Sequence, residues 1–378
     1  MEQFDVVIIG AGMGGASLAW TLAPQRRVLV LERESQPGYH STGRSAAVLH
    51  SSYGNRAIRA LTAASAPFYR DPPSGFTEAP LARPRAVLKV ASAEQLAELE
   101  QELERSRWFV PQARRLDAQA CLELVPALRA DYVAAGMIDP TMLDLDVAVI
   151  LAGFLRGARA HGAVVRTSAR IDAIERVSGD WRIATESGEV RAPFVVDAAG
   201  AWADTVAELA GLGPLGIIPH RRTAILVEAP KDGQSGSWPM IEAIGESWYV
   251  KPDAGQLLCS PADETPSPPC DAQPDELDIA ICVDRIEQAF SLPIRRIAGR
   301  WAGLRSFAAD RTPVAGLDPR AEGFVWLAGQ GGYGIQTAPA LAALTAAAIL
   351  DEAPRGPVAD ADLDRTAVAP ARLLSAKS

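Results

Sequence analysis

The sequence predicts an α/β fold interleaved with an α+β region, built by a chain of 378 residues. Near the N-terminus, a short apolar strand (5–9), a glycine loop and a helix to Leu22 lead into a second strand (27–32). Near the C-terminus, an apolar strand (324–328) is followed by a second glycine loop and an Ala/Leu-rich helix (341–350). Between these ends lie short strand-like runs separated by Gly, Pro and Ser, which are typical of mixed or antiparallel sheets. Two similar ends around a different middle predict two interleaved domains.

The middle of the chain predicts helices as well as strands. One amphipathic helix is expected at 92–105, and a second helix (145–161) leads into the strand "AVVRT". Residues 171–200 alternate apolar and polar like a β-meander that closes on a buried strand (194–197). Further on, "TAILVEA", "SWYVKP" and "QLLCS" are expected as strands, and the polar loop 261–276 precedes a helix.

The composition excludes several classes of function. The chain carries 37 Lys+Arg and 46 Asp+Glu, a net charge of −9, which argues against a nucleic-acid partner held by bulk charge. Glu2 and Asp5 stand where a signal peptide carries basic residues. The four cysteines form no CxxC motif and the four histidines form no ligand-like cluster, so free thiols and no metal site are expected. These features predict a cytoplasmic protein.

One uncharged run, residues 324–350, is long enough to span a membrane. Its first half contains clustered glycines, and the run also holds a proline and two glutamines. These residues favour a buried strand, loop and helix, so no integral membrane segment is expected.

The first glycine loop, "GAGMGG", has the spacing and context of a Rossmann-type dinucleotide site. Gly10 permits the tight turn, Gly12 lets the backbone approach a pyrophosphate, and Gly15 packs the helix against the strand. The phosphates then meet free N–H groups at the positive end of the helix. Glu32 ends the second strand, where an acid accepts from ribose hydroxyls and repels a 2′-phosphate. The loop therefore predicts FAD or NAD rather than NADP; the alternative is a tight turn without a ligand.

The stretch after this βαβ unit favours FAD. "GYHSTGRSAAVLHSSYGN" (38–55) is polar and rich in Gly, Ser and Ala. The small residues Ser45, Ala46 and Ala47 would let a flat ring system lie against the backbone, whereas an NAD dehydrogenase continues into further βα units here. The alternative interpretation is a surface loop.

Six motifs occur in order along the chain: "VVIIGAGMGGASLAWTLA", "VLVLERE", "HSTGRSAA", "VVDAAGAWAD", "GLRSFAADRTPVAG" and "WLAGQGGYGIQTAPA". Together they resemble the D-amino-acid-oxidase-like family of FAD oxidoreductases, which includes glycine oxidase, sarcosine oxidase and D-amino acid dehydrogenases. "STGRSAA", Tyr53, "HRRT", "WYVKP" and "GLRSFAAD" look closest to its D-arginine-dehydrogenase-like branch. The resemblance implies an FAD-binding domain made of residues 1–76, 143–205 and 306–378. It implies a substrate-binding domain, built on a mixed or antiparallel sheet with helices, made of residues 77–142 and 206–305.

The resemblance also implies which residues hold FAD, non-covalently. The pyrophosphate would lie against Gly10, Gly12, Met13, Gly14 and Gly15, and would be flanked by Ala199, Gly200 and Trp202. The adenosine would lie by Glu32, Arg33 and the backbone of Arg170 and Ile171. The ribityl chain and one flavin edge would be lined by Ser41, Thr42, Arg44, Ser45 and Ala46. The pyrimidine end of the flavin would be reached by Gly331, Gly332, Gly334, Ile335 and Gln336.

The second glycine loop, "GQGGYGIQT" (329–337), is not expected to form a second dinucleotide site. No acid at the end of a following strand stands behind it in the way that Glu32 follows the first loop. Its N–H groups and the following helix start would instead face the flavin N1–C2=O edge and stabilise the reduced flavin. The carbonyl of Gly332 would hold the substrate amine.

The resemblance places a carboxylate clamp on the substrate side. Arg305 and Arg222 would bind the carboxylate, because the planar arginine fork matches it bidentately. Tyr249 would add a phenol hydrogen bond. Arg221 is ranked lower because adjacent residues of a strand face opposite ways.

A loop is expected to close over this site. Tyr53 would lie in a mobile lid with Gly54 as its hinge. His50 would tune or accept the amine proton. The alternatives are that His50 is a polar loop residue and that the amine binds deprotonated.

The expected substrate is a neutral, apolar or small D-amino acid. Members of the branch that handle basic D-amino acids place a carboxylate near "ARPRAVLKV", but no acid occurs here between Ala79 and Ala93. Val48 also replaces a lid histidine. Hydride transfer from Cα to flavin N5 would give an imino acid that hydrolyses to a 2-oxo acid and ammonia. Alternatives are a glycine/sarcosine-type or cyclic secondary amine oxidase, a 2-hydroxy acid dehydrogenase, and a flavin-binding subunit of a complex. Oxygen and a quinone both fit as electron acceptors.

Overall fold

A six-stranded sheet carries both glycine loops in the computed structural model, which describes residues 1–231 and 233–374. Its order is β10-β3-β2-β14-β22-β21, and all neighbours are parallel except β21 and β22. The strands are β2 (Val6–Ile9), β3 (Val28–Leu31), β10 (Val164–Arg166), β14 (Phe194–Asp197), β21 (Val314–Leu317) and β22 (Phe324–Ala328). The glycine loops leave the carboxyl ends of β2 and β22, on either side of β14, where parallel sheets bind ligands.

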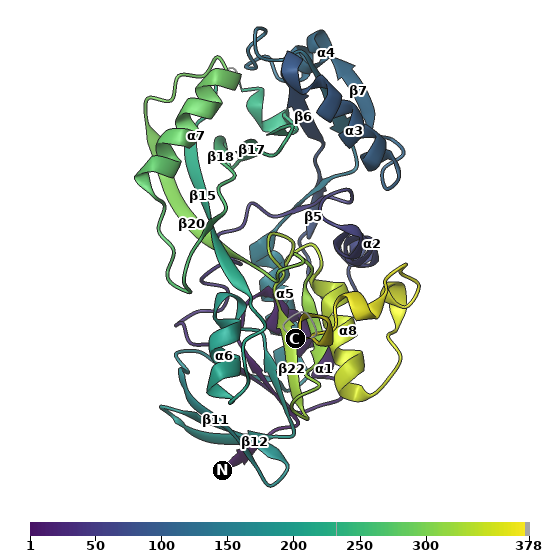
Figure 1. Ribbon diagram of the computed structural model, residues 1–378, viewed down its shortest axis with the longest axis vertical. Helices are drawn as coiled ribbons and strands as arrows, with labels where there is room; N and C mark the ends of the chain where they lie inside the picture. The colour runs from purple at the N-terminus through teal and green to yellow at the C-terminus, as the bar shows by residue number, and fades with distance from the viewer. Residues whose placement is uncertain (232, 375–378) are drawn as a thin grey trace.

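Both faces of this sheet are covered, which explains why its strands are continuous apolar runs. One face packs against α1 (Met13–Leu22) and α8 (Ala338–Leu350). In the same layer, α5 (Val147–Ala160) packs against α1 and α2 (Arg56–Arg70) packs against α8. The other face packs against α6 (Ala203–Leu209) and a four-stranded sheet. That sheet is formed by β1 (Glu2–Gln3), β13 (Gly188–Ala192), β12 (Asp180–Thr185) and β11 (Ile171–Val177). These elements form the lower half of the molecule in Figure 1.

A nine-stranded sheet forms the upper half (Figure 1). Its order is β19-β15-β18-β17-β16-β6-β8-β7, with β20 also paired to β15. The strands are β6 (Val87–Ala91), β7 (Arg114–Asp117), β8 (Ala135–Asp139), β15 (Ile218–Glu228), β16 (Met240–Ala243), β17 (Tyr249–Asp253), β18 (Gln256–Ser260), β19 (Thr265–Pro266) and β20 (Ile297–Phe307). One face packs against α7 (Glu276–Ala289) and α4 (Ala118–Leu124), while α3 (Leu96–Arg107) covers β6 and β8. The long β15 and β20 reach down to the lower half.

Short elements complete the fold. β4 (Val48–Leu49), β9 (Leu143–Leu145) and β5 (Ala82–Pro84) form a three-stranded sheet between the two halves. Single 3₁₀ turns and a last short helix are found at Ala93–Gln95, Gly200–Trp202, Ser235–Ser237, Gly356–Val358, Arg365–Ala367 and α9 (Ala371–Leu374).

The fold class predicted from the sequence is confirmed, and so are most of its elements. The predicted helix at 92–105 is a 3₁₀ turn followed by α3, and the meander is β11–β13. The uncharged run 324–350 is β22, a loop and α8, with Trp326 fully buried. No helix in the described part of the chain is long and apolar enough to cross a membrane. The sequence did not predict α2 or β20. Residue 232 and residues 375–378, which fall within the predicted domains, lie outside the described residues.

Candidate active site

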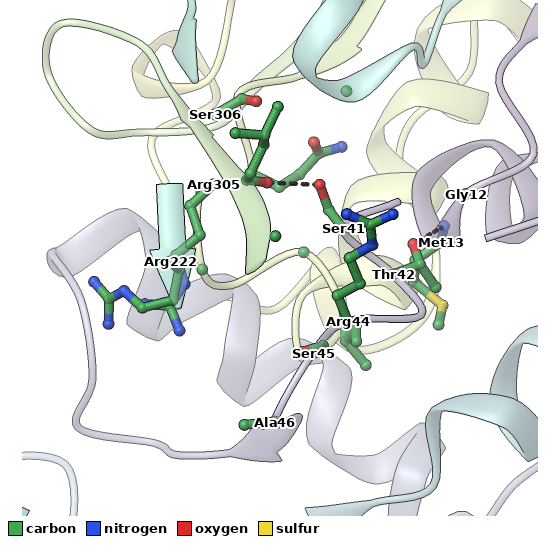
Figure 2. A pocket seen from close by; sticks show the side chains of 18 of the residues that line it. Gly12, Met13, Ser41, Thr42, Arg44, Ser45, Ala46, Arg222, Arg305 and Ser306 are labelled. Atoms are coloured by element: carbon green, nitrogen blue, oxygen red, sulfur yellow. Dashed lines mark hydrogen bonds between the residues drawn. The ribbon is translucent and has the colours of Figure 1, made fainter. Parts of the chain in front are cut away.

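The first glycine loop turns sharply between β2 and α1. Gly10 has a φ of +102°, and a Cβ on it would lie 2.5 Å from the carbonyl oxygen of Ala198. A Cβ on Gly15 would lie 1.9 Å from the oxygen of Gly10, so only glycine lets α1 pack this closely. The turn brings the start of α1 to the loop after β3, where the Met13 N–H donates to Thr42 Oγ1 at 3.1 Å (Figure 2).

Glu32 lies beside this loop at the end of β3. One carboxylate oxygen accepts from the Ala11 N–H at 2.8 Å, and the other accepts from the Glu34 N–H at 2.9 Å. The backbone therefore fixes the acid at the rim of a cavity, where a ribose partner is required. Arg33 extends over the far side of the same cavity, with its Cζ 5.5 Å from the centre of the Trp202 ring.

Three adjoining cavities run from Glu32 to the nine-stranded sheet. Their volumes are about 290 Å³ for the adenosine-side cavity, about 140 Å³ for the middle cavity and about 60 Å³ for the inner cavity. Gly12 and Thr42 line both of the first two, and Arg222 and Tyr249 line both of the last two. An acid at one end, glycine backbone along the middle and small side chains beyond fit an extended dinucleotide such as FAD.

The structure brings the predicted cofactor residues together along these cavities, apart from Gly15, which packs the helix. The adenosine-side cavity is lined by Gly10, Gly12, Glu32, Arg33, Ser41, Thr42, Arg170, Ile171, Ala199, Gly200 and Trp202. The middle cavity adds Met13, Gly14, Arg44, Ser45, Ala46, Gly331, Gly332, Gly334 and Ile335. Gln336 lines the inner cavity.

Arg44 lines the middle cavity, but its guanidinium is used by the protein itself. It donates to the carbonyl oxygens of Ala272 at 2.8 Å and Ala302 at 2.9 Å, and it pairs with Asp271. Ser41 Oγ donates to the Leu304 carbonyl at 2.6 Å (Figure 2). These contacts tie the cofactor loop to β20 and to the loop before α7.

Gln336 and Arg170 also use their side chains on the protein. The Gln336 amide accepts from the His50 N–H at 3.1 Å and donates to Thr62 Oγ1 at 2.9 Å, so it fixes the His50 loop. Arg170 pairs with Asp172 and, at 3.2 Å, with Glu186. Its side chain is 62% exposed, which agrees with the predicted backbone contact.

Arg222 and Arg305 come from neighbouring strands and face the same cavities. In the antiparallel pair β15 and β20, Arg222 lies opposite Gly303 and His220 lies opposite Arg305. Because alternate residues of a strand share a face, this register puts both arginines on one face of the sheet. Figure 2 shows them together on one side of the pocket, with Ser41, Thr42 and Arg44 on the other.

The two arginines differ in their partners. Arg222 Nη2 lies 3.0 Å from Glu264 Oε1, and its Nε donates to the Asp263 carbonyl at 2.8 Å. The guanidinium of Arg305 makes no hydrogen bond or ion pair with any residue that the structure describes. Burial and the charge of Arg305 lower the pKa of Arg222. Arg221 faces the opposite side, as predicted, with its Nη2 2.7 Å from Asp278 of α7.

Tyr53 and His50 lie at the inner cavity, where the sequence predicts a lid. The Tyr53 ring packs 4.9 Å from Tyr333 and stacks 5.7 Å from His50. Burial raises the pKa of Tyr53, so its phenol stays protonated. His50 Nε2 lies 3.1 Å from Ser52 Oγ and 3.7 Å from Asp139 Oδ2. Burial, together with the charges of Lys89 and Arg59, lowers the pKa of His50 to about 3, so this imidazole is neutral.

Two acids that lie outside the segment from Ala79 to Ala93 reach the substrate pocket. Glu242 and Glu246 line the inner cavity with Arg305 and Tyr249. The segment from Ala79 to Ala93 is free of acids, but β16 pairs in parallel with β6 and brings its own glutamate there. The sequence signal was "MIEA", four residues that were too few to be recognised as a strand.

Comparisons with known proteins agree with this geometry. The model of the DAO family, described as FAD dependent oxidoreductase, matches residues 5–348. Glycine oxidase from Geobacillus kaustophilus is 24% identical, over 91% of this chain and 92% of that protein. Mitochondrial dimethylglycine dehydrogenase from Rattus norvegicus is 25% identical over 69% of this chain, but the match spans only 31% of that longer protein. The crystal structure of L-proline dehydrogenase from P. horikoshii superposes with a TM-score of 0.82 at 20% identity, covering 99% of both chains.

Proposed function

We propose, from the premise that this chain belongs to the FAD dependent oxidoreductase family, that it oxidises the Cα–N bond of a D-amino acid to an imino acid. The imino acid then hydrolyses to a 2-oxo acid and ammonia. The chain uses FAD, and its activity on an amine or amino acid is supported by the names of two relatives, dimethylglycine dehydrogenase and glycine oxidase. The D configuration and the individual residue roles are part of the proposal.

One observation carries the proposal: a half-buried arginine, whose guanidinium has no hydrogen-bond or ion-pair partner in the described part of the chain, faces the cavity next to the second glycine loop. Arg305 lines both the middle and the inner cavity, and its guanidinium forms no hydrogen bond or ion pair with a described residue. A guanidinium in this position is complementary to a carboxylate. Arg222 and Tyr249 line the same two cavities and supply further donors.

The chain's own residues orient and shield the substrate. When bound, FAD supplies the ring that accepts the hydride. Arg305 and Arg222 hold the carboxylate, and the carbonyl of Gly332 accepts from the amine. Tyr53 lines the inner cavity and packs against Tyr333, and the two rings would shield the substrate from water. A pKa of about 3 makes His50 a weak proton acceptor, so the amine is expected to bind deprotonated.

A second candidate function is the oxidation of glycine or an N-methylated glycine. The names of two relatives, glycine oxidase and dimethylglycine dehydrogenase, favour it. The arginine clamp serves both functions equally, and it also serves cyclic secondary amines and 2-hydroxy acids. The neutral side chain predicted from the sequence depended on a pocket without an acid, so it is not carried into the proposal. A cytoplasmic location and an oxygen or quinone acceptor remain predictions.

An anaerobic flavin-reduction screen tests the proposal. The purified holoprotein is mixed with D- and L-amino acids, glycine and N-methylglycines, and 2-hydroxy acids, and the flavin absorbance is followed. We expect D-amino acids to bleach the flavin fastest. Bleaching by N-methylglycines alone would establish the second candidate instead. A flavin that no amine or hydroxy acid bleaches would support a flavin-binding subunit without chemistry of its own.

A further inference from the structure

The carboxylate that the sequence did not predict lies on the same sheet face as the predicted substrate residues. In the registers of β16, Glu242 is opposite Lys89 of β6 on one side and Tyr249 of β17 on the other. Residues opposite one another in a sheet point to the same face. Their neighbours Leu88, Ile241 and Val250 face the other way, into the core beneath α7. Glu242 is therefore aimed at the cavity that Tyr249 and Arg305 line.

Glu242 is buried and only weakly compensated. Its side chain is 13% exposed, and it accepts no hydrogen bond from any residue in the described part of the chain. Its ion-pair partner, Lys89 Nζ, lies 3.9 Å away and is closer to Glu102, at 2.9 Å. A single ammonium thus serves two carboxylates, while Glu246 adds a third negative charge to the lining of the cavity. Buried charges are normally paired, so this arrangement lacks a cation.

The pKa of Glu242 reflects its burial and the same excess of negative charge over positive charge around its carboxyl. Burial is the main reason why the pKa of its carboxyl is raised to about 7, and Glu246 and Glu102 raise it further. Lys89 and Arg305 act in the opposite direction without cancelling the shift. A bound cation would stabilise the ionised form.

The inner cavity is polarised from one end to the other. Arg222 and Arg305 line both the middle and the inner cavity, whereas Glu242, Glu246 and the apolar side chains of Met240 and Trp248 line the inner cavity and not the middle one. About 60 Å³ holds roughly four or five water-sized groups, which matches a short aliphatic chain with a terminal ammonium.

We propose that Glu242 is a specificity-determining residue that binds a second, positively charged group at the far end of the substrate side chain, assisted by Glu246. This inference rests on the proposed function, because it takes the arginine pair as the site of the substrate carboxylate. It names the substrate class as diamino acids of about the size of ornithine. It reverses the neutral side chain that the sequence predicts.

Two isosteric ligand pairs test this inference on the holoprotein. D-Ornithine and D-norleucine are oxidisable and differ only in a terminal ammonium or methyl group. 5-Aminopentanoate and hexanoate differ in the same way but lack the α-amine, so they report binding alone, through the perturbation of the flavin spectrum. Wild type, Glu242→Gln and the control Glu102→Gln are compared. The control removes a charge beside Lys89 without lining the cavity.

We expect the charged member of each pair to bind about ten- to a hundredfold more tightly in the wild type. E242Q should abolish this preference by weakening the charged ligand, while the neutral ligand binds as before. E102Q should change the preference by less than E242Q does. If no D-amino acid reduces the flavin but 5-aminopentanoate still binds preferentially, the cation site stands and the proposed oxidation fails. Equal binding within each pair, or a preference that survives E242Q, overturns the inference.

Discussion

The guanidinium of Arg305 lies directly against the backbone of Gly332. A Cβ on Gly332 would lie 3.0 Å from Arg305 Nη1 and 3.1 Å from its Cζ. Because Gly332 has no side chain, the second glycine loop provides the space that the guanidinium of Arg305 occupies. The middle cavity and the inner cavity meet at this contact, because Arg305 and Gly332 line both of them.

Replacing Gly332 with alanine is expected to displace Arg305 and weaken substrate binding about tenfold or more, while FAD stays bound. Anaerobic titration with a D-amino acid measures the affinity, and flavin absorbance measures the cofactor content. In an Arg305→Met background the same alanine should add little, because the displaced side chain is already gone. If the losses of affinity caused by the two substitutions add in full, Gly332 does not act through Arg305.

Arg305→Met is expected to weaken substrate binding by about a hundredfold, because it removes hydrogen bonds between two charged groups. Its effect on thermal stability should be small, since no described residue pairs with this arginine. The matched variant is Arg222→Met, which should cost stability as well, because it removes the hydrogen bonds of Arg222 to the Asp263 carbonyl at 2.8 Å and to Glu264 at 3.0 Å. Rapid flavin reduction and melting curves of both proteins check this. Loss of FAD from the Arg305 variant would give this residue a cofactor role instead.

The cofactor side could be predicted from the sequence because its residues lie in short contiguous motifs. The spacing of Gly10 and Gly15 in the motif predicts the tight turn and the close packing of the helix, and Glu32 follows at the end of the next strand. Small residues after that strand pointed to a flat ring. The same motifs placed the strands β2, β3, β14 and β22 of the central sheet.

The far end of the substrate cavity could not be predicted in this way. Glu242 acts beside Val87 and Lys89 only because β16 pairs with β6 across about one hundred and fifty residues of chain. A single sequence does not give such a register, since strand pairing is decided by packing on both faces. The absence of an acid from the segment 79–93 therefore does not describe the whole pocket. The strand β20 was missed for a similar reason: its glycines and charged residues hide an 11-residue strand.

Gly15→Ala is expected to destabilise the fold by about 1–3 kcal/mol and to release FAD, because the new methyl group would lie 1.9 Å from the Gly10 oxygen. Gly236→Ala is the matched control, since it has no heavy atom within 4 Å of its Cβ and no left-handed φ, and its effect should be small. Melting temperature and the flavin-to-protein absorbance ratio measure both. An alanine at position 15 that retains stoichiometric FAD would contradict the close packing of α1.

His50→Asn is expected to leave the pH dependence of flavin reduction unchanged. The pKa of His50 is lowered to about 3, so the imidazole is already neutral over the whole working range and loses no proton within it. The reduction rate should rise with pH as the substrate amine loses its proton. Stopped-flow reduction with two amines of different pKa checks this, because the rise should follow the substrate. A rise that shifts with the substitution would instead assign a proton transfer to His50.

The affinity for 5-aminopentanoate is expected to increase with pH between about 6 and 8, by up to about tenfold. Neither group of this ligand titrates in that range. Glu242 does, because burial and the neighbouring Glu246 and Glu102 raise its pKa to about 7 against the opposing charges of Lys89 and Arg305. Below that pH the carboxyl is neutral and offers no charge to the ammonium; above it the carboxylate attracts the ammonium. Titrations monitored by the flavin spectrum should show the change for 5-aminopentanoate and not for hexanoate, and Glu242→Gln should remove it. A pH dependence shared by both ligands would trace to another group, and the cation would then have no partner in Glu242.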